Sequence, residues 1–69
     1  MVRSVLLYPG EDGQWVAECP SLPGCVSQGR TKADAIENIK EAIQGWIETT
    51  RAHGQPIPEE RFEAQVVCV

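Results

Sequence analysis

The stretch CPSLPGCVSQG, residues 19–29, decides the fold of this chain. Each of its prolines lacks a backbone N–H, so residues 20–24 cannot continue a sheet ladder and should form a rigid corner. The corner leads to a short strand, Cys25 to Gln28, and Gly29 ends that strand. The stretch therefore predicts two neighbouring strands of an antiparallel meander, joined by a corner of fixed shape.

An amphipathic helix follows directly. Thr31 is suited to the N-cap position, and Asp34 three residues later gives an acidic form of the capping box. Apolar residues then recur at spacings of three and four and form one stripe, which comprises Ala35, Ile36, Ile39, Ala42, Ile43, Trp46 and Ile47. Gly54 supplies a C-terminal cap, and Pro56 and Pro58 bar further helix. The pattern predicts a helix from about Thr31 to about Gly54 with one face on the sheet.

Two strands are expected before the corner and one after the helix. Val2 to Tyr8 is rich in Val and Leu, and Pro9 to Gly13 is a turn that leads into the alternating segment Gln14 to Cys19. Phe62 to Val69 alternates again. Its apolar side carries Phe62, Ala64, Val66 and Cys68, opposite Glu63 and Gln65. The predicted order is strand, strand, strand, helix, strand.

These elements predict an α+β fold of the type βββαβ. A meander followed by a right-handed helical crossover puts the fourth strand beside the first and parallel to it, which gives a mixed sheet of order 3-2-1-4 with the helix on one face. The face that the helix covers should carry Trp15, Ala17, Cys19, Val5 and Leu7. The open face should carry the candidate interface residues Leu6, Tyr8, Val16 and Glu18. An open apolar face serves as a binding surface or is an aggregation risk.

Composition indicates one compact domain over residues 1–69. The chain has 42% hydrophobic and 23% charged residues, and a domain of about this size buries only roughly 60% of its unfolded surface. Its three cysteines, without a C-x-x-C pair or a signal peptide, do not indicate a disulfide framework, so we expect a homodimer or homotetramer to supplement the core. No apolar run approaches the roughly 20 residues of a membrane span, so we expect a cytoplasmic protein.

The charge distribution favours a basic protein partner over a nucleic acid. The net charge is −4 and the pI is about 4.8. The six Lys and Arg residues are scattered singly, whereas phosphate binding depends on clustered cations. An acidic surface would steer a basic, RNA-binding protein to this chain and compete with RNA for it.

Residues 20–43 resemble the signature of the HicB-like antitoxins. In that family the motif P-x-L-P-G-C-x-x-Q-G-x-T is followed by a helix with the pattern x-x-A-x-x-N-x-x-E-A-I. Both are present here. The flanks agree, because Asp12-Gly13-x-Trp15-Val16 matches the second strand of the family and Gly54-Gln55-Pro56-Ile57-Pro58 matches its exit from the helix. The resemblance implies a truncated RNase H-like fold and a protein that binds and silences a toxin.

The partner that the resemblance implies is a HicA-like toxin, a basic mRNA interferase that resembles a small double-stranded-RNA-binding domain with a catalytic His. Many HicB antitoxins carry a C-terminal DNA-binding domain, and this chain stops at the expected fourth strand, so we expect the short, single-domain class. The alternative is a stand-alone oligomeric domain without a toxin partner, which uses its open sheet face for a protein or a small ligand. The sequence leaves open whether a toxin exists and which face binds it.

The related fold raises the question of nuclease activity. RNase H-type hydrolysis needs several carboxylates at the sheet to hold two metal ions. The first strand has none, and Glu18 and Glu63 are the only carboxylates in the expected strands. We therefore expect no enzyme, no catalytic residue, no metal site and no cofactor.

Four further residues have a structural interpretation. His53 should support the end of the helix, Cys25 should be a small buried hydrophobe, and Trp46 should belong to the core. Asn38 belongs to the family pattern, as does Glu41, and should hydrogen-bond to the loop of residues 22–25.

Overall fold

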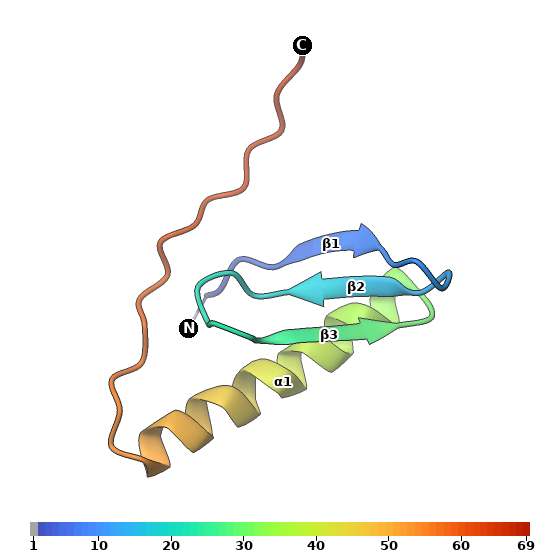
Figure 1. Cartoon of the computed structure of the whole chain (residues 1–69). Coiled ribbons are helices and arrows are strands. Elements are labelled where there is room, and N and C mark those ends of the chain that lie inside the picture. Colours follow the sequence, from blue (N-terminus) through green and yellow to red (C-terminus); the bar gives the residue numbers. More distant parts are fainter. Residues whose placement is uncertain (1) are drawn as a thin grey trace.

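The structure is a computed structural model that describes residues 2–69 as a three-stranded sheet and one long helix (Figure 1). The strands are β1 (Leu6–Pro9), β2 (Trp15–Glu18) and β3 (Val26–Gly29), and the helix is α1 (Lys32–Ala52). The sheet has the order β1-β2-β3, and both pairs are antiparallel. The expected α+β class, the meander and the helix after it are confirmed.

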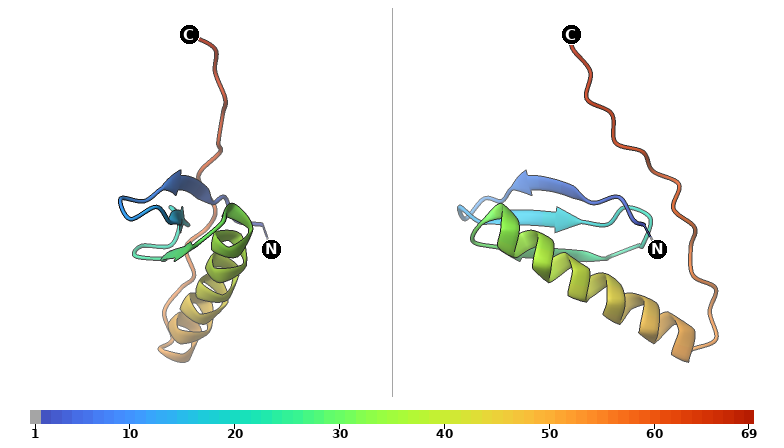
Figure 2. Two further views of the ribbon diagram at one scale, coloured as in Figure 1. Left: turned by 90° about the vertical axis from the view of Figure 1, so that its right-hand side faces the viewer. Right: turned by 180° about the vertical axis from the view of Figure 1, so that it is seen from behind.

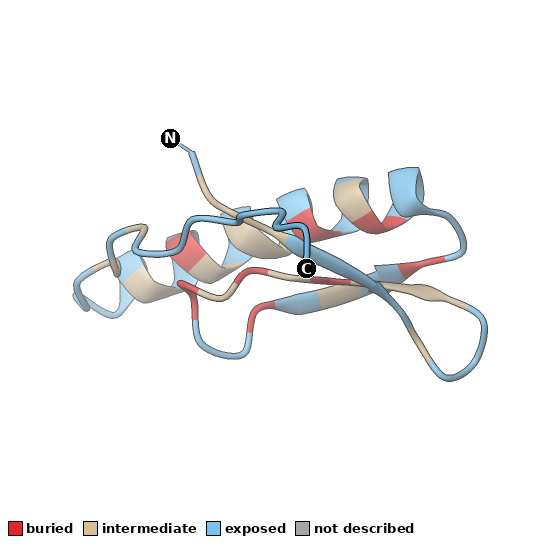
Figure 3. Cartoon of the chain, turned by 90° about the horizontal axis from the view of Figure 1, so that it is seen from above, coloured by how far each residue is buried: buried red, intermediate tan, exposed pale blue. Residues whose placement is uncertain are grey.

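The molecule has two layers, with α1 on one face of the sheet (Figure 2). The helix packs mainly on β3 and β2. The core between the layers consists of Ala17, Cys19, Leu22, Cys25, Ala35, Ile39 and Ile47. Figure 3 shows these buried positions in red on the sheet, the corner and the helix. Complete burial of a side chain such as Ile39 stabilises a fold by about 1.5–3 kcal/mol.

The corner of residues 19–25 satisfies its own backbone. The Cys19 N–H donates to the Cys25 carbonyl at 2.9 Å, and the Cys25 N–H donates to the Leu22 carbonyl at 3.0 Å. The Leu22 side chain is 1% exposed, so the corner also fills the core. Gly24 has a φ of +77°, a backbone conformation that favours glycine.

Both ends of the helix form as the sequence predicts. Thr31 Oγ1 accepts a hydrogen bond from the Asp34 N–H at 3.1 Å, which is the expected N-cap. At the other end Gly54 has a φ of +70° and its N–H donates to the Arg51 carbonyl at 2.9 Å. The Gln55 N–H donates to the Thr50 carbonyl at 3.0 Å, which completes a Schellman motif.

Strand β3 and helix α1 meet closely at Gly29. A Cβ atom at this position would lie 2.6 Å from the backbone nitrogen of Ala35, so a side chain has no room there. Asn38 Nδ2 donates to the Gln28 carbonyl at 2.7 Å and fixes the same junction. The partner predicted for Asn38 was therefore wrong, since the amide binds β3 and not the loop of residues 22–25.

The structure corrects the expected fourth strand. Residues 62–69, which we call the C-terminal arm, form no strand, are exposed along their whole length and run away from the sheet (Figure 1). Hydrogen bonds hold Glu60 at the base of β1, and the chain leaves the sheet directly after them. The sheet order 3-2-1-4 is therefore not formed within residues 2–69, and the RNase H-like relationship stays a prediction.

Candidate interaction face and groove

The four residues predicted for the open face lie together on the sheet. Leu6 of β1 is opposite Glu18 of β2, and Tyr8 is opposite Val16. Their neighbour Ala17 is completely buried on the helix side, so alternation directs Val16 and Glu18 away from α1. We call this surface the outer face.

The outer face continues onto β3 at a residue that the sequence analysis did not single out. Val26 is opposite Glu18 and is 51% exposed, beside Leu6 at 46% and Tyr8 at 42%. The signal was present, because Cys25 was expected to be buried and the next residue of a strand points to the other side. The outer face is therefore apolar across all three strands.

A polar pair lies within this apolar surface. The Tyr8 hydroxyl donates to Glu18 Oε1 at 3.1 Å. This hydrogen bond to the carboxylate, with smaller effects from desolvation and from the Glu18 charge, raises the pKa of Tyr8 above 10.0. Tyr8 therefore stays protonated at neutral pH and holds the Glu18 carboxylate in place.

The helix side of the sheet is covered unevenly. Trp15 is half-buried on β2, and the Lys32 ammonium lies 4.7 Å from the centroid of its ring. Leu7 on β1 was expected beneath the helix but is 37% exposed, because α1 lies over β2 and β3. The underside of β1 is consequently open.

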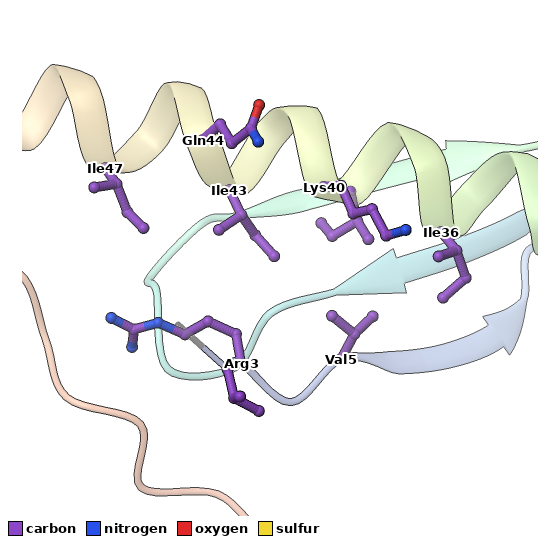
Figure 4. Close-up of a pocket in the computed structure, with 9 residues that line it drawn as sticks. Arg3, Val5, Ile36, Lys40, Ile43, Gln44 and Ile47 are labelled. Carbon is purple, nitrogen blue, oxygen red and sulfur yellow. The ribbon is translucent and has the colours of Figure 1, made fainter.

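A groove of about 610 Å³ lies between α1 and the segment of residues 2–5 that leads into β1 (Figure 4). Its lining residues are Val2, Arg3, Val5, Ile36, Ile39, Lys40, Ile43, Gln44 and Ile47. Figure 4 shows Val5 on one side and Ile36, Ile43 and Ile47 of the helix on the other, with Arg3 and Lys40 as the charged members. The groove is mainly apolar, contains two cationic side chains, and lies beside the segment directly before β1.

Glu60 is bonded to the same N-terminal segment that lines the groove. Its Oε1 atom accepts hydrogen bonds from the Ser4 N–H and from the Ser21 hydroxyl, both at 3.0 Å. The bond from Ser4, followed by those from Ser21 and Phe62 and the charge of Arg3, outweighs desolvation and lowers the pKa of Glu60 below 4.5. The segment before the arm is therefore tied to the base of β1.

Arg3 is incompletely satisfied in this arrangement. Its Nη1 atom donates to the Ser21 hydroxyl at 3.1 Å. Its Nε atom is buried and has no hydrogen-bond partner within residues 2–69. A buried donor of this kind is uncommon and calls for an acceptor.

The other residues that the sequence analysis singled out make contacts that stabilise the fold or lie exposed on the arm. His53 Nδ1 lies 2.8 Å from the Thr49 carbonyl at the end of the helix, and Trp46 is half-buried and donates to the Pro23 carbonyl at 3.0 Å. Cys25 is buried, which raises the pKa of its thiol. Cys68 on the arm is an exposed free thiol.

The described residues provide neither a metal-binding cluster nor a membrane-spanning helix. Within residues 2–69 no three His, Cys, Asp or Glu side chains are placed to hold a metal ion together. In the same residues, α1 has neither the length nor the hydropathy required to cross a membrane. Glu18 lies in β2 beside Tyr8, and Glu63 lies on the arm beside Gln65.

Comparison with known proteins gives one family and several relatives. Residues 4–67 match the family described as "HicB_like antitoxin of bacterial toxin-antitoxin system". The chain is 44% identical over 63 residues to the UPF0150 protein Ta0767 of Thermoplasma acidophilum, with 91% of each chain covered. It is 51% identical over 57 residues to the UPF0150 protein ssr1765 of Synechocystis, covering 83% of this chain and 72% of that protein. The protein ssl0259 of Synechocystis is 36% identical over 65 residues, 94% of this chain and 86% of its own.

Proposed function

Because the chain belongs to the HicB-like antitoxin family, we propose that it is an antitoxin that binds a HicA-like mRNA interferase and covers the surface on which that toxin cleaves RNA. The match includes residues 4–67, and so extends from the start of the fold into the C-terminal arm. Membership of this family favours a binding role over a catalytic one, because occlusion of a toxin requires no chemistry from the antitoxin.

The outer face is the observation that carries this proposal. Leu6 and Tyr8 of β1 and Val26 of β3 are exposed, and with Val16 of β2 between them they form an apolar surface across the sheet, opposite the layer that holds the core. A contiguous apolar surface that contains a few polar groups is typical of a protein interaction site. We place the toxin contact on Leu6, Tyr8, Val16 and Glu18, with Val26 as an additional member.

Charge supports a basic partner at this face. The chain has a net charge of −4, and Glu18 is a carboxylate on the outer face that the Tyr8 hydroxyl holds in position. A toxin that binds RNA presents cations where the RNA lies. An acidic side chain on the outer face would pair with those cations and compete with the phosphates of the RNA. In this proposal the chain acts in the cytoplasm and does not itself contact nucleic acid.

The test is an affinity pull-down from the native organism with this chain tagged at its N-terminus, followed by an RNA cleavage assay with the recovered partner. We expect one small basic protein that cleaves RNA alone and is inhibited when the chain is restored. Recovery of a partner that does not cleave RNA would favour the alternative of a stand-alone binding domain. The absence of any stoichiometric partner would contradict the proposal.

A matched pair of variants tests the face. Glu18→Lys on the outer face and Glu48→Lys on the exposed side of α1 change the net charge equally. We expect Glu18→Lys to weaken toxin binding by about tenfold or more, which corresponds to about 1.4 kcal/mol, and Glu48→Lys to change it little. Equal affinities of the two variants in titration calorimetry would exclude the outer face as the contact.

A further inference from the structure

We propose that two copies of this chain exchange their C-terminal arms, so that the arm of each lies in the groove of the other as a fourth strand beside β1. The groove, the free edge of β1 and the arm are three features that the single chain leaves without a partner. The proposal pairs them with one another. It concerns the helix side of the sheet and does not depend on toxin binding at the outer face.

The arm has the pattern that this groove requires. Phe62, Ala64, Val66 and Cys68 alternate with the other residues of the arm, so an extended arm presents all four on one side. Gln65 Nε2 donates to Glu63 Oε1 at 3.1 Å, which places these two polar side chains together on the opposite side. Val66 is fully exposed in the single chain, and its burial in the groove would stabilise the assembly.

The dimensions of the two parts agree. The helix residues of the groove extend from Ile36 to Ile47, which is roughly 16 Å at 1.5 Å per residue. Residues 62–69 in extended form span roughly 26 Å at 3.3 Å per residue. The arm is therefore long enough to follow the whole groove and to pair with β1 as it does so.

The polar groups of the groove also fit the arm. The buried Nε atom of Arg3 has no acceptor within residues 2–69, and a backbone carbonyl of an incoming strand would supply one. Lys40, the other cationic residue of the groove, already pairs with Glu37 at 3.2 Å, so an apolar strand does not leave it unpaired.

The course of the chain favours exchange over return to its own groove. Glu60 is held by Ser4 and Ser21, and the Ser4 hydroxyl donates to the Phe62 carbonyl at 2.9 Å. These bonds fix the chain beside Arg3, and Figure 4 shows it passing this end of the groove without entering it. Beyond Phe62 the arm runs away from its own sheet (Figure 1). An arm that leaves in this direction is available to a second copy.

Reciprocal exchange would fill the groove and pair the β1 edge of both copies at once. A two-fold axis would bring each arm to the other copy's β1, which is the self-complementary arrangement usual in dimers and in domain swapping. Each sheet would gain a fourth strand, and both unpaired edges at β1 would be removed. The four-stranded sheet absent from the single chain would then form between chains.

Sedimentation equilibrium of full-length variants tests the exchange. Val66→Asp adds a carboxylate to the apolar side of the arm, and Gln65→Asp adds the same group to the polar side. Both positions are exposed in the single chain, so neither substitution should unfold it. We expect the wild type to have at least twice the mass of one chain, Val66→Asp to have half the wild-type mass, and Gln65→Asp to match the wild type.

Hydrogen exchange on the same samples locates the contact. We expect the amides of β1 to be protected in the wild type and in Gln65→Asp, and to lose protection at least tenfold in Val66→Asp. A wild type with the mass of a single chain would overturn the proposal, as would an unchanged mass for Val66→Asp or a halved mass for both variants. A halved mass for Val66→Asp with unchanged β1 protection would place the arm elsewhere and would also overturn it.

Discussion

Glu60 makes the fold sensitive to acid at a single residue. Its folded-state pKa lies below the ordinary value of 4.5, chiefly because the Ser4 N–H donates to the carboxylate. A depressed pKa contributes stability that is present above the unfolded-state pKa and is lost as the pH falls through the folded-state pKa. We expect stability to decrease as the pH falls below 4.5 and Glu60→Gln to make this decrease shallower. Urea unfolding at a series of pH values measures the free energy of unfolding. The control is Glu59→Gln, which removes a neighbouring exposed carboxylate.

Tyr8 offers a direct test of the outer face, because it is the only tyrosine of the chain. Its raised pKa results mainly from the hydrogen bond to Glu18. Glu18→Gln removes the carboxylate charge and weakens the preference for the protonated phenol, so we expect the Tyr8 pKa to move down toward 10.0. Ultraviolet titration follows the phenolate. An unchanged midpoint in Glu18→Gln would show that the two side chains do not interact in solution.

At the scale of elements, the contact between β3 and α1 depends on one glycine. Gly29→Ala would place a Cβ atom 2.6 Å from the Ala35 nitrogen, so the strand and the helix would have to separate. We expect a loss of about 1–3 kcal/mol, the usual range for overpacking. Gly45→Ala within α1 meets nothing within 4 Å and should stabilise by about 0.5–1 kcal/mol through helix propensity. Chemical denaturation measures the free energy of unfolding of both variants. We expect it to decrease in Gly29→Ala and to increase in Gly45→Ala if the junction is as close as described.

Local patterns were sufficient to predict most of the elements. Thr31 and Gly54 marked the ends of the helix because capping is decided by a few adjacent residues. Alternation in Gln14 to Cys19 predicted which side of β2 is buried, and hence two of the core residues, Ala17 and Cys19, and the outer face. The hydrogen-bond partner of Asn38 could not be predicted, because it depends on the packing of α1 against β3 and not on sequence spacing.

The arm shows the limit of the same reasoning at the scale of the whole molecule. Its alternation indicates a strand with one apolar side, but a pattern within one segment does not identify the edge that it pairs with. The groove was not predicted either, since it depends on α1 lying over β2 and β3 and leaving β1 partly uncovered. Residues from two places in the chain line it, the segment of residues 2–5 and helix α1, and their meeting is a result of tertiary packing.

Exchange of arms would make the stability of the molecule depend on its concentration. Association stabilises the folded state by mass action, so the midpoint of thermal unfolding should rise with protein concentration. We expect this rise in the wild type and its absence in Val66→Asp, measured by circular dichroism over a hundredfold range of concentration. A midpoint in the wild type that does not depend on concentration would contradict exchange.

The unequal exposure of the three thiols has a practical consequence. Cys19 and Cys25 are buried, and burial raises the pKa of Cys25, so both should react slowly with an alkylating reagent. Cys68 alone is freely accessible on the extended arm, on the same side as Val66. Its alkylation should be fast when the arm is free and slow when the arm is covered. The rate of one reaction at one sulfur atom would then report where the arm lies, in a mixture and without purification.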